Sequence, residues 1–129
     1  MRLLTAIVAS AGMLAAGCVE MTGDDGYLTH TEHTLTAAQR ASVQAGMSGY
    51  LKVPVQLSGL RASYLLSDGT VPVCGYVSAT VNGKTSPPAL FAGTLSGGAF
   101  APYKVPGQGQ DPARIATVRA FCQAQHIQI

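Results

Sequence analysis

The segment from Val71 to Val81 constrains the fold more than any other part of the chain. Apolar and mostly polar residues alternate along it, and the apolar set is Val71, Val73, Val77, Ala79 and Val81. A period of two residues is typical of a β-strand, because successive side chains of a strand point to opposite faces of the sheet. We therefore expect this segment to be one strand of a β-sheet.

Turn signals around this strand predict three more strands. The signals are Ser67-Asp68-Gly69, Asn82-Gly83 and Ser96-Gly97-Gly98. Asn-Gly favours a two-residue hairpin turn, because both of its residues tolerate positive φ. The expected strands form an antiparallel meander and span residues 60–66, 71–81, 89–95 and 99–104.

One helix is expected before the sheet region. Thr36-Ala37-Ala38-Gln39 matches a capping box, in which the Thr and Gln side chains satisfy free amides of the first turn. Pro54 ends the helix, since a proline moves the preceding residue out of the α region. Gly46 and Gly49 weaken the helix by about 1 kcal/mol each unless they permit close packing. The apolar stripe of this helix is Val43, Met47, Tyr50 and Leu51.

A second helix is expected at the C-terminal end of the domain. It begins at Asp111-Pro112, with Asp as N-cap and Pro at the first helical position, and runs to about Gln125. Arg114 and Arg119 lie outside its apolar face, and His126 is expected to cap the helix end electrostatically. The residues that share this mostly apolar face are Ile115, Val118, Phe121, Cys122 and Gln125.

The first eighteen residues are typical of an export signal. Arg2 precedes an apolar run of about 14 residues, shorter than the about 20 that a bilayer span needs. The run ends in Leu14-Ala15-Ala16-Gly17-Cys18, which resembles the lipobox of bacterial lipoproteins, although Ala15 stands where a large aliphatic residue is usual. The resemblance implies removal of residues 1–17 and lipidation of Cys18. Ordinary secretion with cleavage nearby and an uncleaved N-terminal anchor are the alternatives.

The chain has three cysteines, and lipidation of Cys18 leaves Cys74 and Cys122 as one pair. Disulfides are the default in an oxidising compartment, so we expect a Cys74–Cys122 bond. In the chain-entropy model, closing a loop of about 50 residues stabilises the fold by about 4 kcal/mol.

These elements predict an α+β domain in which both helices pack on one face of the sheet. The disulfide conflicts with that arrangement, because strict alternation places Cys74 opposite the valine face. We expect a bulge at Gly75 to change the parity of the strand. The alternative is that something else covers the valine face.

No segment carries a complete catalytic or metal-binding motif. Residues 18–34 lack periodicity and are expected to be a flexible tether before a single domain at 35–129. Within the tether, His30-Thr31-Glu32-His33 is a possible ligand cluster without a third or fourth partner, so no metal and no cofactor are expected. Gly46-Met47-Ser48-Gly49-Tyr50 lacks the last glycine of a nucleophile elbow, and no catalytic residue is predicted. Tyr76 and Tyr103 are core residues or, alternatively, a small exposed binding patch.

Several motifs over residues 36–125 together resemble a family of small exported bacterial proteins and lipoproteins, typically proteobacterial, with a Val-Cys-Gly-x-Val-Asn core. The matching positions are Gln39, Val43, Leu51-Lys52-x-Pro54, Asp68-Gly69, Val73-Cys74-Gly75-x-Val77, Phe91-x-Gly93-x-Leu95 and Cys122. Ser78 and Pro87-Pro88 depart from the family pattern. The resemblance implies a fold and an envelope location, and it implies no catalytic residue.

The sequence therefore predicts a non-enzymatic, lipid-anchored envelope protein, with the membrane and another envelope protein as partners and no small-molecule substrate. Val19, where an aspartate would signal inner-membrane retention in some enteric bacteria, favours the outer membrane, facing the periplasm. The alternative is a periplasmic binder or inhibitor of a cell-envelope hydrolase that inserts the loop Val105–Gln110. A small hydrolase would need His126 near a Ser or Asp. A charged share of 11% and a net charge of +2 exclude a nucleic-acid binder with a dense basic face.

Overall fold

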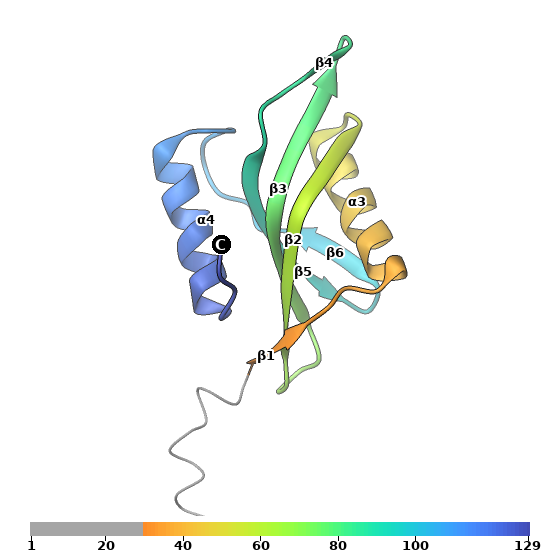
Figure 1. Ribbon diagram of the computed structural model, residues 1–129, viewed down its shortest axis with the longest axis vertical. Helices are drawn as coiled ribbons and strands as arrows, with labels where there is room; N and C mark the ends of the chain where they lie inside the picture. The colour runs from red at the N-terminus through yellow and green to blue at the C-terminus, as the bar shows by residue number, and fades with distance from the viewer. Residues whose placement is uncertain (1–29) are drawn as a thin grey trace, which may run out of the picture.

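The computed structural model describes residues 30–129 and contains two helices and one sheet (Figure 1). The α+β class is confirmed, with six strands in place of the expected four. The predicted signal peptide, Cys18 and the tether as far as residue 29 lie outside the described residues. The elements are β1 (His30–His33), α3 (Ala37–Leu51), β2 (Val55–Leu65), β3 (Val71–Val81), β4 (Lys84–Thr85), β5 (Ala89–Ser96), β6 (Ala99–Pro102) and α4 (Pro112–Ala124).

The sheet is antiparallel, with strand order β1-β2-β3-β5-β6 and the short β4 paired to β3. The four predicted strands do follow one another across the sheet, but the first of them begins at Val55, before the expected residue 60. A further strand, β1, extends the sheet beyond β2. Assignment of residues 30–33 to the tether is therefore wrong, because His30–His33 pair with Ala62–Leu65.

The two helices cover opposite faces of the sheet and form three layers with it (Figure 1). Placement of both helices on one face is therefore wrong. Val71, Val73 and Val77 of β3 pack in the core under α3, with Val43 and Met47. Cys74 and Tyr76 of the same strand pack in the core under α4, with Val118 and Cys122. Each face of β3 thus has its own helix, and the apparent conflict between the valines and Cys74 disappears.

The bulge expected at Gly75 lies in β2 instead, directly opposite that residue. The pairing of β3 with β5 runs without a break from Val71 to Val77. Between Ser58 and Arg61, by contrast, β2 has two residues, Gly59 and Leu60, where β3 has only Gly75. Gly59 has φ +57°, a left-handed value that glycine adopts at little cost and that is common at bulges.

This bulge explains why the sequence pattern did not predict the first half of β2 as a strand. Val55 and Leu57 precede it, Leu60 is part of it and Ala62 follows it, and all four lie in or against the core under α3. The extra residue moves the apolar side chains from odd to even positions while they keep the same face. A search for strict alternation therefore finds no continuous period across the strand.

Both expected helix starts are confirmed. At the start of α3, Gln39 N donates to Thr36 Oγ1 at 3.1 Å, and Thr36 N donates to Gln39 Oε1 at 3.0 Å. At the start of α4, Arg114 N donates to Asp111 Oδ2 at 3.1 Å, and Pro112 occupies the first turn. These local hydrogen bonds satisfy amides that have no partner within the helix.

Gly46 allows α3 to approach β6 closely at Phe100. A Cβ at Gly46 would lie 2.9 Å from both Phe100 O and Phe100 Cδ2. On the other side of the ring, a Cβ at Gly93 of β5 would overlap the Phe100 ring. The close packing that would justify a glycine in this helix is therefore present at Gly46, whereas at Gly49 a Cβ would meet nothing within 4 Å.

We expect alanine to have opposite effects at these two glycines of α3. Gly49→Ala should raise the free energy of unfolding by about 1 kcal/mol, because alanine favours the helix and meets open space. Gly46→Ala should lower it by about 1–3 kcal/mol through overpacking against Phe100. Urea unfolding of both variants, followed by circular dichroism, measures the difference. Equal stabilisation by the two substitutions would contradict the close contact at Gly46.

A carboxylate at the β2–β3 turn provides a pH-dependent contribution to stability. Thr70 N and Thr70 Oγ1 donate to Asp68 Oδ1 at 3.0 and 2.8 Å. These hydrogen bonds favour the charged form and lower the pKa of Asp68 below its usual value. The stabilisation is therefore present above that usual value and is lost as the pH falls through the lowered pKa. In a plot of unfolding midpoint against pH, Asp68→Asn should remove the part of the acid-induced loss of stability that comes from protonation of Asp68. An unchanged pH profile would contradict a stabilising role of the Asp68 carboxylate.

Candidate functional site

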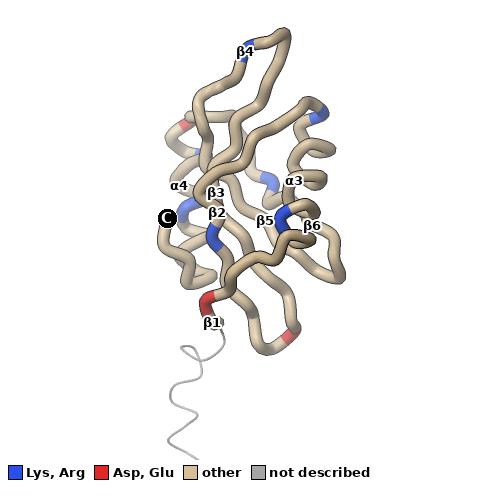
Figure 2. Tube along the Cα trace, turned by 45° about the vertical axis from the view of Figure 1, so that its right-hand side comes forward, with Lys and Arg blue, Asp and Glu red and all other residues tan. Residues whose placement is uncertain are grey.

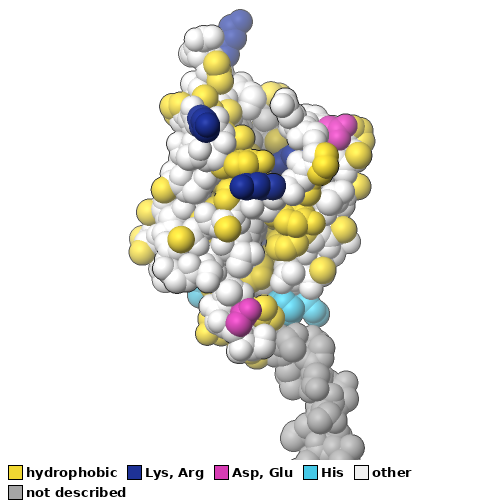
Figure 3. All heavy atoms as spheres, turned by 180° about the vertical axis from the view of Figure 1, so that it is seen from behind, with side chains coloured by type: hydrophobic (Ala, Val, Ile, Leu, Met, Phe, Trp, Pro, Cys, Tyr) yellow, Lys and Arg dark blue, Asp and Glu magenta, His cyan; other side chains and the backbone are white. Residues whose placement is uncertain are grey.

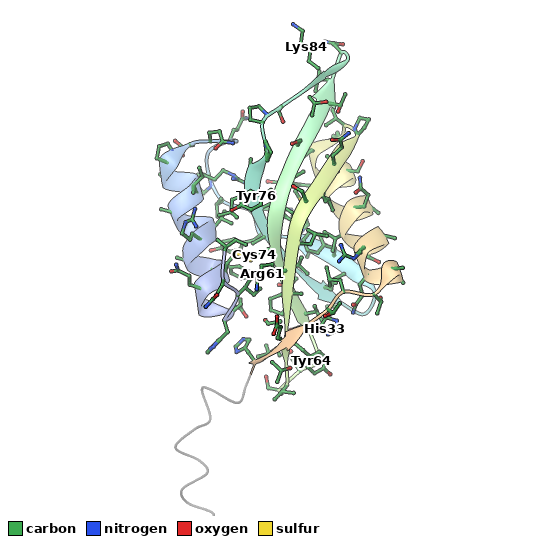
Figure 4. The ribbon with its side chains drawn as sticks, viewed as in Figure 1. His33, Arg61, Tyr64, Cys74, Tyr76 and Lys84 are labelled. Carbon is green, nitrogen blue, oxygen red and sulfur yellow. A yellow bond between two sulfur atoms is a disulfide. The ribbon has the colours of Figure 1, made fainter. Side chains whose placement is uncertain are left out.

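A disulfide joins the middle of the sheet to α4. Cys74 on β3 and Cys122 on α4 have an S–S distance of 2.04 Å and a Cα–Cα distance of 6.3 Å, which confirms the expected pairing. Both residues are fully buried in the core under α4. Figure 4 shows Cys74 and Tyr76 projecting from β3 toward α4. The bond therefore fixes this helix on its face of the sheet.

Two histidines hold β1 to both helices. His30 and His33 are three residues apart in a strand, so their side chains point to opposite faces of the sheet. His33 Nε2 lies 2.9 Å from Gln39 Oε1 at the start of α3, and His33 lies beside Tyr64 (Figure 4). His30 Nε2 lies 3.1 Å from Gln125 Oε1 at the end of α4. The strand is thus linked to one helix terminus on each face.

The histidine cluster of the sequence is not arranged as one metal site. His30 and His33 lie on opposite faces, so their imidazoles cannot bind the same ion. Within residues 30–129, no group of three or more His, Cys, Asp or Glu side chains is placed to hold a metal ion. His30 instead stacks on His126, with the ring centroids 4.7 Å apart. The hollow beside His126 is lined by Glu32 and Arg61, and no Ser or Asp of the described chain lines it.

A groove of about 550 Å³ opens between the C-terminal half of α3 and the loop at residues 103–109. Figure 3 shows this side of the molecule, on which hydrophobic side chains gather between the two helices, with basic side chains beside them. Of the expected apolar stripe of α3, Val43 and Met47 are buried, whereas Tyr50 and Leu51 remain 43% and 38% exposed. The apolar lining consists of Met47, Tyr50, Leu51, Val77, Ala79, Ala89, Ala92, Pro102, Tyr103 and Val105.

The groove lies along the part of β5 that β6 leaves uncovered. Since β6 pairs only with residues 93–96, three carbonyl groups of the preceding segment need other partners. Gln110 Nε2 donates to Pro88 O at 2.6 Å, Arg114 Nη1 to Leu90 O at 2.7 Å, and Tyr103 N to Ala92 O at 2.8 Å. These bonds occupy acceptors that an added strand would use.

Arg114 extends the sequence interpretation of α4. The sequence places it outside the apolar face of the helix, and from there its guanidinium reaches back to the edge of the sheet and also donates to Gly109 O at 3.3 Å. The apolar pattern could not reveal this position, because a long side chain at a helix start can reach back over the neighbouring layer. Only the arrangement of the layers brings Arg114 to the groove.

The charge around the groove is positive. Lys104 Nζ lies 5.9 Å from the centre of the Tyr50 ring, and Arg114 lines the groove. Among the described residues no carboxylate lines it, and the nearby Asp111 accepts from the backbone of Arg114. Figure 2 shows that basic residues outnumber acidic ones over the described chain. The exposed patch suggested for Tyr76 and Tyr103 does not form as such, because Tyr76 packs in the core under α4 and Tyr103 stacks on Phe121 at 4.4 Å.

Comparison with known proteins gives no match to this chain among protein-family models, curated proteins or solved structures. Of the described helices, neither α3 nor α4 has the length and apolar character needed to cross a bilayer.

Proposed function

We propose that this chain is a lipid-anchored protein of the bacterial cell envelope, at the outer membrane, whose domain contacts another envelope component without catalysing a reaction. The pairing of Cys74 with Cys122 carries this proposal. Disulfides persist in oxidising compartments such as the periplasm. Because two of the three cysteines are paired, Cys18 remains as the thiol for acylation, at the end of the lipobox-like segment.

Acylation of Cys18 would supply the attachment. A diacylglyceryl group on the thiol and an amide-linked third chain exceed the about two chains that stable anchoring needs. Residues 19–29 then separate the anchored cysteine from β1, the first described element of the domain. The domain is therefore presented at the membrane through its N-terminal edge strand.

Metabolic labelling with an alkyne-bearing fatty acid tests the anchor. We expect the wild-type chain to incorporate the label and Cys18→Ala to lose it, because the acyl chains depend on that cysteine. The double variant Cys74→Ala/Cys122→Ala is the matched control and should keep the label. The label is measured on total protein, so that loss of folding in this variant does not affect the result. Equal labelling of wild type and Cys18→Ala would refute the lipid anchor.

The alternative, binding or inhibition of an envelope hydrolase, would use the loop Val105–Gln110. Residues 106–110 of this loop are exposed, which is the observation in its favour. Crosslinking in intact membranes, followed by purification of the chain, separates the two roles. Recovery of a single hydrolase in equal amount favours inhibition, whereas recovery of a non-enzymatic envelope component favours the interaction role.

A further inference from the structure

The groove between α3 and the loop at residues 103–109 has the properties of a ligand site. We propose that it binds an anionic amphiphile of the fatty-acid class, with one acyl chain along the apolar lining and a carboxylate at the basic rim. Its volume of about 550 Å³ falls within the ~300–1,000 Å³ of small-molecule pockets, which are concave and mostly apolar with a few polar groups. This inference is independent of the lipid anchor at Cys18.

The apolar part of the groove is open to water. Tyr50, Leu51 and Tyr103 are 43%, 38% and 38% exposed, and all three line the groove. Met47 and Val77, which belong to the core under α3, lie deeper in the same lining. Removal of such surface from water is favourable, so an apolar chain is a suitable occupant.

The polar groups favour a negative charge at one end of that occupant. The two hydrogen bonds of Arg114, to Leu90 O and Gly109 O, both use Nη1, so Nη2 and Nε remain available among the described contacts. Lys104 lies between the lining residues Tyr103 and Val105 in the chain and stands over the Tyr50 ring. Arg114 is the one charged residue of the described lining, Lys104 lies beside the groove, and the Asp111 carboxylate next to Gly107 accepts from the backbone of Arg114. An anionic head group complements the positive charge that remains.

The edge of β5 argues against an extended peptide as the occupant. The carbonyl oxygens of Pro88, Leu90 and Ala92 already accept hydrogen bonds from the protein itself. A peptide that adds to a sheet edge gains affinity mainly from main-chain hydrogen bonds, and these acceptors are taken. An acyl chain needs none of them.

Photo-crosslinking of the purified full chain tests the site. The probe is a dodecanoate that carries a diazirine on its chain, and mass spectrometry locates the attached label. We expect label on the peptides containing Tyr50-Leu51 and Tyr103–Gln110, with strong competition by unlabelled dodecanoate and weak competition by neutral dodecanol. Label elsewhere, or equal competition by dodecanol, would overturn the proposal.

Two variants and a matched control make the test specific. Leu51→Glu places a carboxylate in the groove at a half-exposed position, and it should abolish labelling. Lys104→Glu reverses the rim charge, and it should reduce labelling by about fivefold, the effect of a partly exposed ion pair. Leu66→Glu introduces the same change at a residue that is 52% exposed and outside the groove, and it should label like wild type. Unchanged labelling of Leu51→Glu would refute the site.

A second control separates the groove from the lipid anchor. Cys18→Ala should also label like wild type, so failure of the anchor and failure of the groove are distinguishable.

Discussion

The double substitution Cys74→Ala/Cys122→Ala should lower the free energy of unfolding by about 4 kcal/mol. The bond closes a loop of 48 residues, and opening this loop restores conformational freedom to the unfolded chain. Since native domains are stable by only about 5–15 kcal/mol, this loss is a large part of the total. Urea unfolding of the variant and of the wild-type chain, with and without dithiothreitol, measures it.

The control for this experiment is chemical as well as genetic. Wild-type protein in reductant should unfold at nearly the same urea concentration as the double variant, because both lack the crosslink. Cys18→Ala lies outside the described domain and should not shift the unfolding midpoint. If reductant leaves the wild-type midpoint unchanged, the bond contributes nothing to stability and the expectation is refuted.

Truncation of Phe91 should cost about 3–5 kcal/mol, the range for removing a buried aromatic side chain. Phe91 is 1% exposed, and its ring meets that of Phe100 edge to face with the centroids 6.1 Å apart. Phe91→Ala would therefore leave a cavity under α3, where Gly93 and Gly46 already allow the layers to pack closely. Thermal and urea unfolding of the purified variant measure the loss.

Phe121→Ala is the matched control for this truncation. Phe121 is only partly buried and stacks on the half-exposed Tyr103 at the rim of α4. Its removal should cost clearly less than removal of Phe91, because less apolar surface leaves the core. Equal losses for the two variants would contradict the full burial of Phe91 in the core under α3.

Helices and strands could be predicted from the sequence where a capping hydrogen bond or a regular apolar period lies within the element itself. The capping box at Thr36, the Asp111-Pro112 helix start and the alternating run of β3 all appear in the structure. The cysteine pairing also appears, because the number of thiols left few choices. Each of these signals depends on residues within one element or on a count.

The arrangement of the layers could not be derived in the same way. The alternation in β3 places valines on one face and Cys74 and Tyr76 on the other. The prediction of both helices on one face of the sheet nevertheless needed a bulge at Gly75 to bring Cys74 to that face. Two helices on opposite faces satisfy the same pattern without any irregularity in β3. The groove was missed for a related reason, since Arg114 and Tyr50 come together only through the three-layer arrangement. The short strand β1 carries no period long enough to detect.

The position of β1 determines how the domain responds to mechanical load. Any tension transmitted from residues before His30 reaches the protein first at a four-residue strand on the border of the sheet. That strand is fastened by its ladder with β2 and by the contacts of His30 and His33. Rupture should therefore begin there, while the covalent link between β3 and α4 keeps the remaining layers assembled under forces that have already detached the leading strand.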